Sequence, residues 1–97
     1  MMSIQLLQQA IFYMEEHLLE DINYEDVATN VHMSSYNFHR TFSAVTGITA
    51  NEYIRNRRLS LAGEELQSTV NSVIDIAYKY GYETPESFSK AFTRFHG

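Results

Sequence analysis

The chain contains two related stretches that decide its fold: DVATNVHMSSYNFHRTF at residues 26–42 and DIAYKYGYETPESFSKAF at residues 75–92. The tripeptides at 26–28 and 75–77 match at an offset of 49 residues, whereas Phe38 and Phe42 match Phe88 and Phe92 at an offset of 50. The extra residue falls between the matching blocks, where a turn absorbs an insertion most easily. The sequence therefore predicts a structural unit that occurs twice.

Each copy has the pattern of a short helix, a tight turn and a longer helix. The longer helix carries two phenylalanines four residues apart, which places both on one face. Ala28 and Ala77 are small enough to let the two helices of a copy approach closely. This is the construction of a helix-turn-helix motif.

The spacing of apolar residues is helical along the whole chain, and six helices are predicted. The first extends from about Ser3 to Glu20, with an apolar stripe made of Ile4, Leu7, Ile11, Met14 and Leu18. Capping residues mark the other five starts, namely Asn23 with Asp26, Ser34 or Ser35, Thr49 with Glu52, Ser72 with Asp75, and Thr84 before Pro85. We predict ends near Val31, Gly47, Gln67, Tyr80 and His96.

These elements predict an all-α chain with two helix-turn-helix subdomains joined by a long connector helix. The first subdomain would occupy residues 1–48, the connector 49–68 and the second subdomain 69–97. A connector of roughly 18 residues is about 27 Å long, close to one turn of DNA at ~34 Å. Such a spacer suits two reading helices placed in successive major-groove segments.

Composition excludes several classes of protein. With no cysteine, the chain has no disulfide, thiolate or cysteine-ligated zinc. No apolar run reaches the ~20 residues of a membrane span and no signal peptide is visible, so we expect a cytoplasmic protein. The histidines lack the spacing of a metal site, and no nucleophile–base set suggests an enzyme or requires a cofactor.

Charge is segregated along the chain. The formal net charge is −5, from seven Lys+Arg and twelve Asp+Glu. Residues 1–39 contain six of the acids and no Lys or Arg, so all seven cations lie in residues 40–97. The net charge opposes DNA binding, but the segregation leaves a face able to approach phosphate.

Residues on the outward faces of the two longer helices are the candidate DNA contacts. They are Ser35, Tyr36, Asn37, His39 and Arg40 in the first copy and Thr84, Pro85, Glu86, Ser87, Ser89 and Lys90 in the second. Arginine pairs with guanine, asparagine with adenine, and hydroxyl groups with bases or phosphates. Arg55, Lys79 and Arg94 are further candidates for phosphate contact, although Arg55 and Arg58 also suit a structural role on the connector.

Over nearly its whole length the chain resembles the DNA-binding domain of the AraC/XylS regulators of bacterial transcription. The motifs are Asp26-Val27-Ala28, Met33-Ser34, Phe38-x-Arg40-x-Phe42, Gly47, Tyr53-Ile54-Arg55-x-x-Arg58-Leu59-x-x-Ala62, Val73-x-Asp75-Ile76-Ala77, Gly81-Tyr82, Ser87-Phe88-Ser89-Lys90-x-Phe92 and Gly97. The resemblance implies transcription regulation by two recognition helices, at about Ser35–Val45 and Pro85–His96.

The chain departs from this family pattern at several positions. His32 replaces the glycine expected in the first turn, and Ser43 and Ala44 stand where lysines are common. Glu83 and Glu86 flank the start of the second recognition helix, so we expect the first unit to read bases better than the second. A final short helix is missing after Gly97, so the second lobe is interpreted as truncated and the chain as the N-terminal fragment of a longer regulator.

Partners and alternatives follow from this interpretation. Double-stranded DNA is the expected partner, with RNA polymerase and a C-terminal effector or dimerisation domain as further candidates and no membrane. The alternative is a protein-interaction module of the same fold that has weak or lost DNA affinity, as the acidic net charge suggests. A third interpretation is a domain that targets an attached catalytic domain to DNA.

Overall fold

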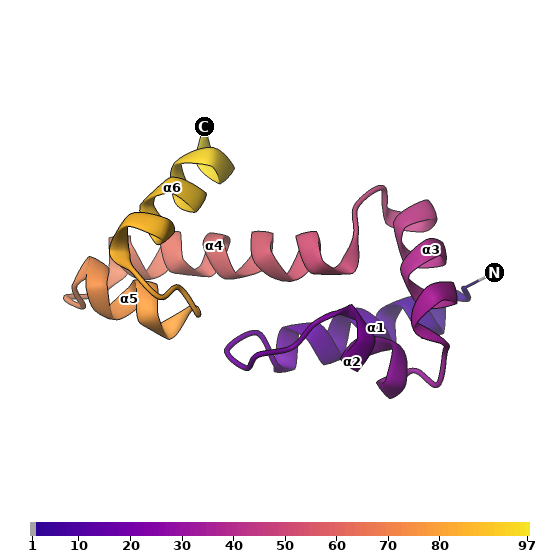
Figure 1. Ribbon diagram of the computed structural model, residues 1–97. Helices are drawn as coiled ribbons and strands as arrows, with labels where there is room; N and C mark the ends of the chain where they lie inside the picture. Colours follow the sequence, from indigo (N-terminus) through magenta and orange to yellow (C-terminus); the bar gives the residue numbers. More distant parts are fainter. Residues whose placement is uncertain (1) are drawn as a thin grey trace. The chain divides into compact units, whose positions relative to one another are not determined.

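Six helices make up the chain in the computed structural model, which describes residues 2–97 (Figure 1). They are α1 (Ile4–Glu16), α2 (Tyr24–Asn30), α3 (Ser35–Thr46), α4 (Ala50–Ser68), α5 (Val73–Lys79) and α6 (Pro85–His96). No strand occurs among the described residues, which confirms the all-α prediction. None of the helices in this part of the chain is long and apolar enough to span a bilayer.

Local capping fixes where the helices begin. Ser34, Ser72 and Thr84 each accept a hydrogen bond from the backbone N–H three residues on, as an N-cap should. Asn23 pairs with Asp26, and Thr49 with Glu52, in reciprocal capping boxes. The predicted helix starts after residue 20 are therefore confirmed. Gly47 ends α3 in the left-handed conformation, with a φ of 84°, so the end predicted near this residue is confirmed.

The first helix begins as predicted, with Ser3 as its N-cap, but it ends earlier than predicted. It stops at Glu16, because His17 leaves the helical conformation with a φ of −122° and its N–H bonds to the Met14 carbonyl. Leu18 is still buried, but in a turn rather than on a helix. Ile4, the first residue of the predicted apolar stripe, is 72% exposed, so the buried part of α1 does not include it. Helical spacing predicts which residues share a face of a helix, but it does not predict how much of that face other helices cover.

The two helix-turn-helix units have the same turn. In both, two backbone N–H groups bond to carbonyl groups three and five residues earlier, on the preceding helix. The pairs are His32 to Thr29 and Met33 to Ala28 in the first unit, and Gly81 to Tyr78 and Tyr82 to Ala77 in the second, at 2.9–3.1 Å. The repeat in the sequence is therefore a repeat in backbone structure.

The central residue of each turn has a positive φ, 59° at His32 and 90° at Gly81. Glycine adopts this conformation without strain, whereas histidine tolerates it at some cost. His32 therefore adopts the left-handed conformation at the turn position where glycine is expected, as Gly81 does in the second turn.

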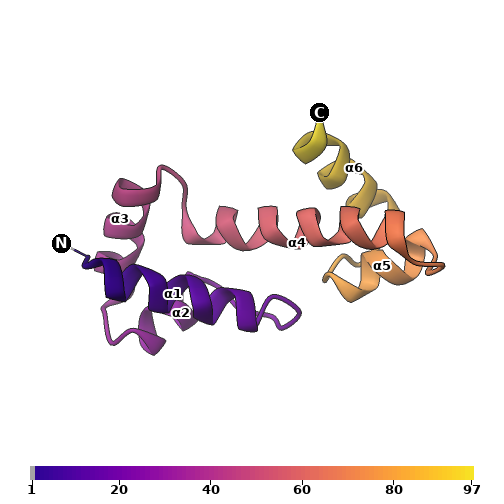
Figure 2. The same ribbon diagram turned by 180° about the vertical axis from the view of Figure 1, so that it is seen from behind.

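The chain divides into two compact units within α4, the first ending at Arg55 and the second beginning at Asn56. In the first unit, α2 contacts both α1 and α3, and the buried core includes Met14, Val27, Phe38, Phe42 and Ile54. In the second unit, α5 contacts α6, and Leu59, Ala62, Ile76, Ala77, Tyr80 and Phe88 form the core. Figure 2 shows each helix-turn-helix from behind.

The phenylalanine pairs pack alike in the two units. The rings of Phe38 and Phe42 lie 5.5 Å apart at 39°, and those of Phe88 and Phe92 lie 5.6 Å apart at 40°. Ala28 and Ala77, expected to permit close helix approach, are both buried. Phe38, Phe42 and Phe88 are buried and Phe92 is half-buried. Because these rings fix how α3 and α6 rotate about their axes, they also fix which residues each helix presents outward.

Candidate nucleic-acid interface

The outward face of α3 carries the residues predicted for the first unit. Tyr36, Asn37, His39 and Arg40 are exposed, on the side away from the buried Phe38 and Phe42. Ser35, the first residue of the helix, is half-buried. The structure thus brings the predicted residues together on one accessible helix face.

Aromatic contacts organise this face. The Arg40 guanidinium lies 5.7 Å from the centre of the Tyr36 ring, within the range of a cation–π contact. The His39 ring lies 5.1 Å from the ring of Tyr24, the first residue of α2. These contacts restrain long side chains that would otherwise be free to move.

The outward face of α6 is arranged in the same way but carries acid. Glu86, Ser89 and Lys90 are exposed, and Pro85 is half-buried. Lys90 is the counterpart of Arg40, and Glu86 the counterpart of Tyr36, at the offset of 50 residues.

Two predicted contacts on α6 already have structural partners. The Thr84 hydroxyl caps α6 by accepting from the Ser87 N–H at 3.1 Å, and it donates to Ser87 Oγ at 3.0 Å. Ser87 Oγ in turn donates to the Thr84 carbonyl at 2.9 Å. Both side chains are exposed but locally bonded, so a DNA contact would have to add to the cap or replace it.

A shallow hollow lies along each helix, and the two hollows share the equivalent positions 40/90 and 44/94. Arg40, Thr41, Ala44 and Val45 line about 270 Å³ on α3. Ser89, Lys90, Thr93 and Arg94 line about 420 Å³ on α6. Arg94 is four residues after Lys90 and therefore on the same side of α6, which agrees with its expected role near phosphate.

Acids are distributed unequally between the two faces. Residues 35–46 contain no Asp or Glu, whereas α6 has Glu86 in its first turn and Glu83 just before it, both exposed. A carboxylate at a helix N-terminus stabilises the helix but repels a phosphate that would bind there. The distribution of acids therefore makes the approach to a phosphate more favourable for α3 than for α6.

Side chains of α4 bind both helix-turn-helix units. Asn51 Oδ1 accepts from the N–H of Tyr24, the first residue of α2, at 2.9 Å. In the same unit, the Tyr53 hydroxyl donates to Glu15 of α1 at 2.8 Å. Arg55, the predicted phosphate contact on α4, is exposed.

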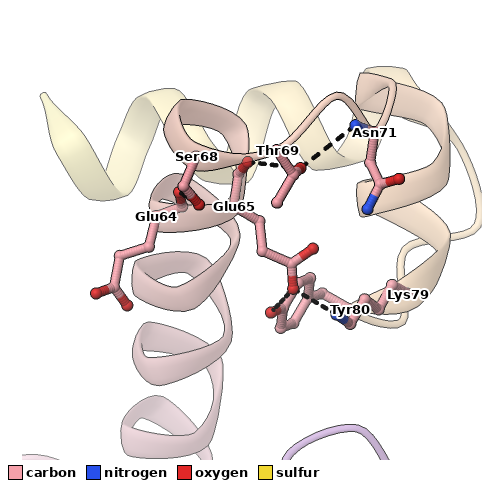
Figure 3. Close-up of polar contacts among 7 residues, drawn as sticks. All are labelled: Glu64, Glu65, Ser68, Thr69, Asn71, Lys79 and Tyr80. Carbon is pink, nitrogen blue, oxygen red and sulfur yellow. Dashed lines mark hydrogen bonds and ion pairs between the residues drawn. The ribbon is translucent and has the colours of Figure 1, made fainter.

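The second unit is bound to α4 through Glu65. This carboxylate accepts hydrogen bonds from Lys79 Nζ at 2.5 Å and from the Tyr80 hydroxyl at 2.6 Å (Figure 3). These two donors hold the pKa of Glu65 below its usual value. Burial, then the bond to Glu65, raises the pKa of Tyr80, which stays protonated. Lys79, predicted to contact phosphate, therefore already has an anionic partner.

Sequence reasoning missed Asn51, Glu65 and Glu15. Their partners are 14 to 38 residues away in the chain, so no local spacing announces the pairs. Among the described residues, no three His, Cys, Asp or Glu side chains gather as metal ligands would.

Comparison with known proteins identifies the family. Residues 27–97 match the family of helix-turn-helix domains described as "Helix-turn-helix domain". Regulatory protein SoxS of Salmonella typhimurium is 39% identical over 90 residues, which cover 93% of this chain and 84% of SoxS. The chain belongs to the AraC/XylS family. It is a helix-turn-helix DNA-binding domain of a bacterial transcription regulator. The family is one of DNA-binding regulators and not a family of enzymes.

Solved structures of two DNA-binding proteins have the same fold. A transcriptional regulator from Chromobacterium violaceum with an AraC-type DNA-binding domain is 26% identical, with a TM-score of 0.89, over 95% of this chain and 82% of that chain. The DNA-binding domain of the global transcriptional factor AdpA, in complex with a target DNA, is 27% identical, with a TM-score of 0.84, over 94% of this chain and 82% of that chain. The comparisons do not favour the alternative of a module without DNA binding.

Proposed function

We propose that α3 and α6 enter successive major-groove segments of one duplex, and that α3 supplies most of the base recognition. The observation that carries this proposal is the repeated turn, whose backbone bonds are the same in both units and which presents Arg40 and Lys90 at equivalent exposed positions. The similar AdpA domain, crystallised with a target DNA, supports it.

On α3, Arg40 has the geometry and exposure to pair with guanine O6 and N7, and Asn37 to pair with adenine. Tyr36 holds Arg40 by the cation–π contact and offers an apolar surface to a thymine methyl group. His39 and Ser35 lie beside them as hydrogen-bonding groups. On α6, Ser89 and Lys90 contact bases or phosphates, and Arg94 contacts a phosphate.

The acidic residues of α6 give it a weaker role. Glu86 is positioned to accept from cytosine N4 but also repels the backbone. Lys90 and Arg94 therefore act mainly by attracting phosphate, which fixes the register of the protein without reading sequence. The bound site should be asymmetric, with stronger base preference in one half.

The test is selection of bound duplexes from a random pool, followed by titration of the selected site. We expect one enriched motif, and Arg40→Ala should weaken binding to it by about 1–3 kcal/mol and relax the preference at one base position. Arg57→Ala removes the same charge from α4 and serves as the matched control, with a smaller effect and an unchanged motif. Equal binding by the parent and Arg40→Ala across a salt titration would contradict the role given to α3.

The proposal extends to partners and location. We propose action in the cytoplasm on promoter DNA, with RNA polymerase as the partner and an effector domain on the same regulator. Transcription in vitro from a promoter that carries the selected site, with purified polymerase, tests the proposed partnership with RNA polymerase. A change in transcript level that Arg40→Ala abolishes is the expected result.

A further inference from the structure

Lys79 is a cation of the second helix-turn-helix, and its charge is paired with a carboxylate of the same protein. It is the last residue of α5, and its ammonium pairs with the Glu65 carboxylate at 2.5 Å. The Lys79 side chain is 44% exposed, whereas that of Glu65 is 18% exposed. Solvent, or an anion from solvent, therefore reaches the lysine more easily than the glutamate.

The two units differ at this point. The position equivalent to Lys79 in the first unit is Asn30, which carries no charge and whose carbonyl accepts from Gln9 at 3.3 Å. Residues 69–97 contain three Lys or Arg and three Asp or Glu, so this lobe has no net charge. Pairing with Glu65 of α4 thus removes one of the three cations that the lobe can offer to DNA.

We propose that Glu65 is an internal substitute for a DNA phosphate: it holds Lys79 in the free protein and yields it to the backbone when the second unit binds. The inference rests on the proposed function. In a helix-turn-helix the first helix crosses the sugar-phosphate backbone, and α5 is that helix in the second unit. An ammonium has three donors, so a phosphate oxygen can join before the carboxylate leaves.

The exchange makes Glu65 a determinant of affinity that touches no DNA. Breaking an exposed ion pair opposes binding by the modest free energy of such a pair. The Tyr80 hydroxyl, bonded to the same carboxylate, keeps Glu65 in place when Lys79 departs. Glu65 therefore lowers the affinity of the second unit without needing to move itself.

The neighbouring Glu64 provides a matched control. Its carboxylate points away from Lys79 and Tyr80, whereas that of Glu65 points toward them (Figure 3). Glu64→Gln and Glu65→Gln change the net charge equally, but only Glu65→Gln removes the negative charge that pairs with Lys79. In Glu65→Gln the amide oxygen still accepts from Tyr80, which favours retention of the fold.

The experiment measures the Kd for a selected duplex in a salt titration for the parent, Glu64→Gln, Glu65→Gln, Lys79→Met and the double variant Glu65→Gln/Lys79→Met. We expect Glu65→Gln to bind about two- to fivefold more tightly than Glu64→Gln at low salt. Its salt dependence should be steeper by up to ~0.9 in log–log slope, the value for one phosphate. When Lys79 is already replaced by Met, the gain in DNA affinity caused by Glu65→Gln should be no larger than the gain that Glu64→Gln causes in the parent.

Glu65→Asp covers the possibility that the glutamine variant unfolds, which circular dichroism would reveal. It keeps the charge, but the shorter side chain draws back from Lys79, so tighter binding is again expected. Equal affinities of Glu64→Gln and Glu65→Gln, or the same gain with and without Lys79, would overturn the inference while leaving the proposed function intact. If no variant binds any duplex at low salt, the proposed function fails, and the inference fails with it.

Discussion

At the scale of single residues, the two turns offer an internal experiment on backbone strain. His32 has a φ of 59°, and Gly81 has a φ of 90° at the equivalent position. The left-handed region costs a residue with a Cβ about 1–2 kcal/mol, whereas glycine loses more entropy on folding. We therefore expect His32→Gly to raise the free energy of unfolding by about 0.5 kcal/mol, measured by urea denaturation.

Two variants isolate the contribution of the Cβ atom. His32→Ala retains it and should not stabilise the protein. Gly81→Ala adds it where no atom beyond the adjacent residues lies within 4 Å, so the expected loss of about 1 kcal/mol is conformational and not steric. If His32→Ala stabilised the protein as much as His32→Gly, the histidine side chain and not the backbone would be the source of strain.

At the scale of helices, the N-cap residues determine where each helix begins. Ser72 Oγ accepts from the Asp75 N–H at 3.2 Å, whereas Ser68 Oγ donates to the Glu64 carbonyl of its own helix at 2.8 Å. An N-cap hydroxyl accepts from a backbone N–H that has no partner within the helix. The Ser68 hydroxyl, in contrast, donates to a carbonyl that lies inside α4 and belongs to its backbone hydrogen-bond pattern. Ser72→Ala should therefore lower the free energy of unfolding by about 1 kcal/mol.

Ser68→Ala is the control, because it removes the same hydroxyl group from an exposed position four residues earlier, at the end of α4. We expect its free energy of unfolding to stay near that of the parent, since Ser/Thr bonds to a carbonyl four residues earlier stabilise helices little. Comparable losses in both variants would mean that the cap of α5 contributes nothing specific. Circular dichroism during denaturation provides the measurement.

The success of sequence-based prediction also varies by element. Helix starts were predictable because an N-cap and its N–H donors lie within three residues of one another. The end of α1 was not, because no glycine or proline follows Glu16 and the apolar pattern continues to Leu18. The exposed faces of α3 and α6 were predictable from the phenylalanine spacing alone, since burial of one face determines the other.

The bonds between helices were beyond local prediction. Lys79 looked like a cation available to phosphate because its partner, Glu65, is 14 residues earlier on a different helix. Glu15 and Tyr53 are farther apart still. Such pairs depend on how helices pack, which a single sequence does not encode at any fixed spacing. The DNA contacts assigned to α3 and α6 therefore stay predictions, although their exposure and grouping agree with the role.

At the scale of the whole molecule, the net charge of −5 must weaken the approach to DNA. Glu16 and Asp21 are exposed and lie in the cation-free segment 1–39, outside both recognition helices. Glu16→Gln/Asp21→Asn should bind duplex DNA about two- to fivefold more tightly at 0.05 M salt, with the gain fading as the Debye length falls to ~8 Å. Neutralising Glu16 at the C-terminal end of α1 should not destabilise the helix, because the dipole opposes an acid there. Glu16→Asp/Asp21→Glu keeps the charge and should behave as the parent does. A gain that persists at high salt, or a changed sequence preference, would mean that these acids act through a local contact and not through the field of the whole protein.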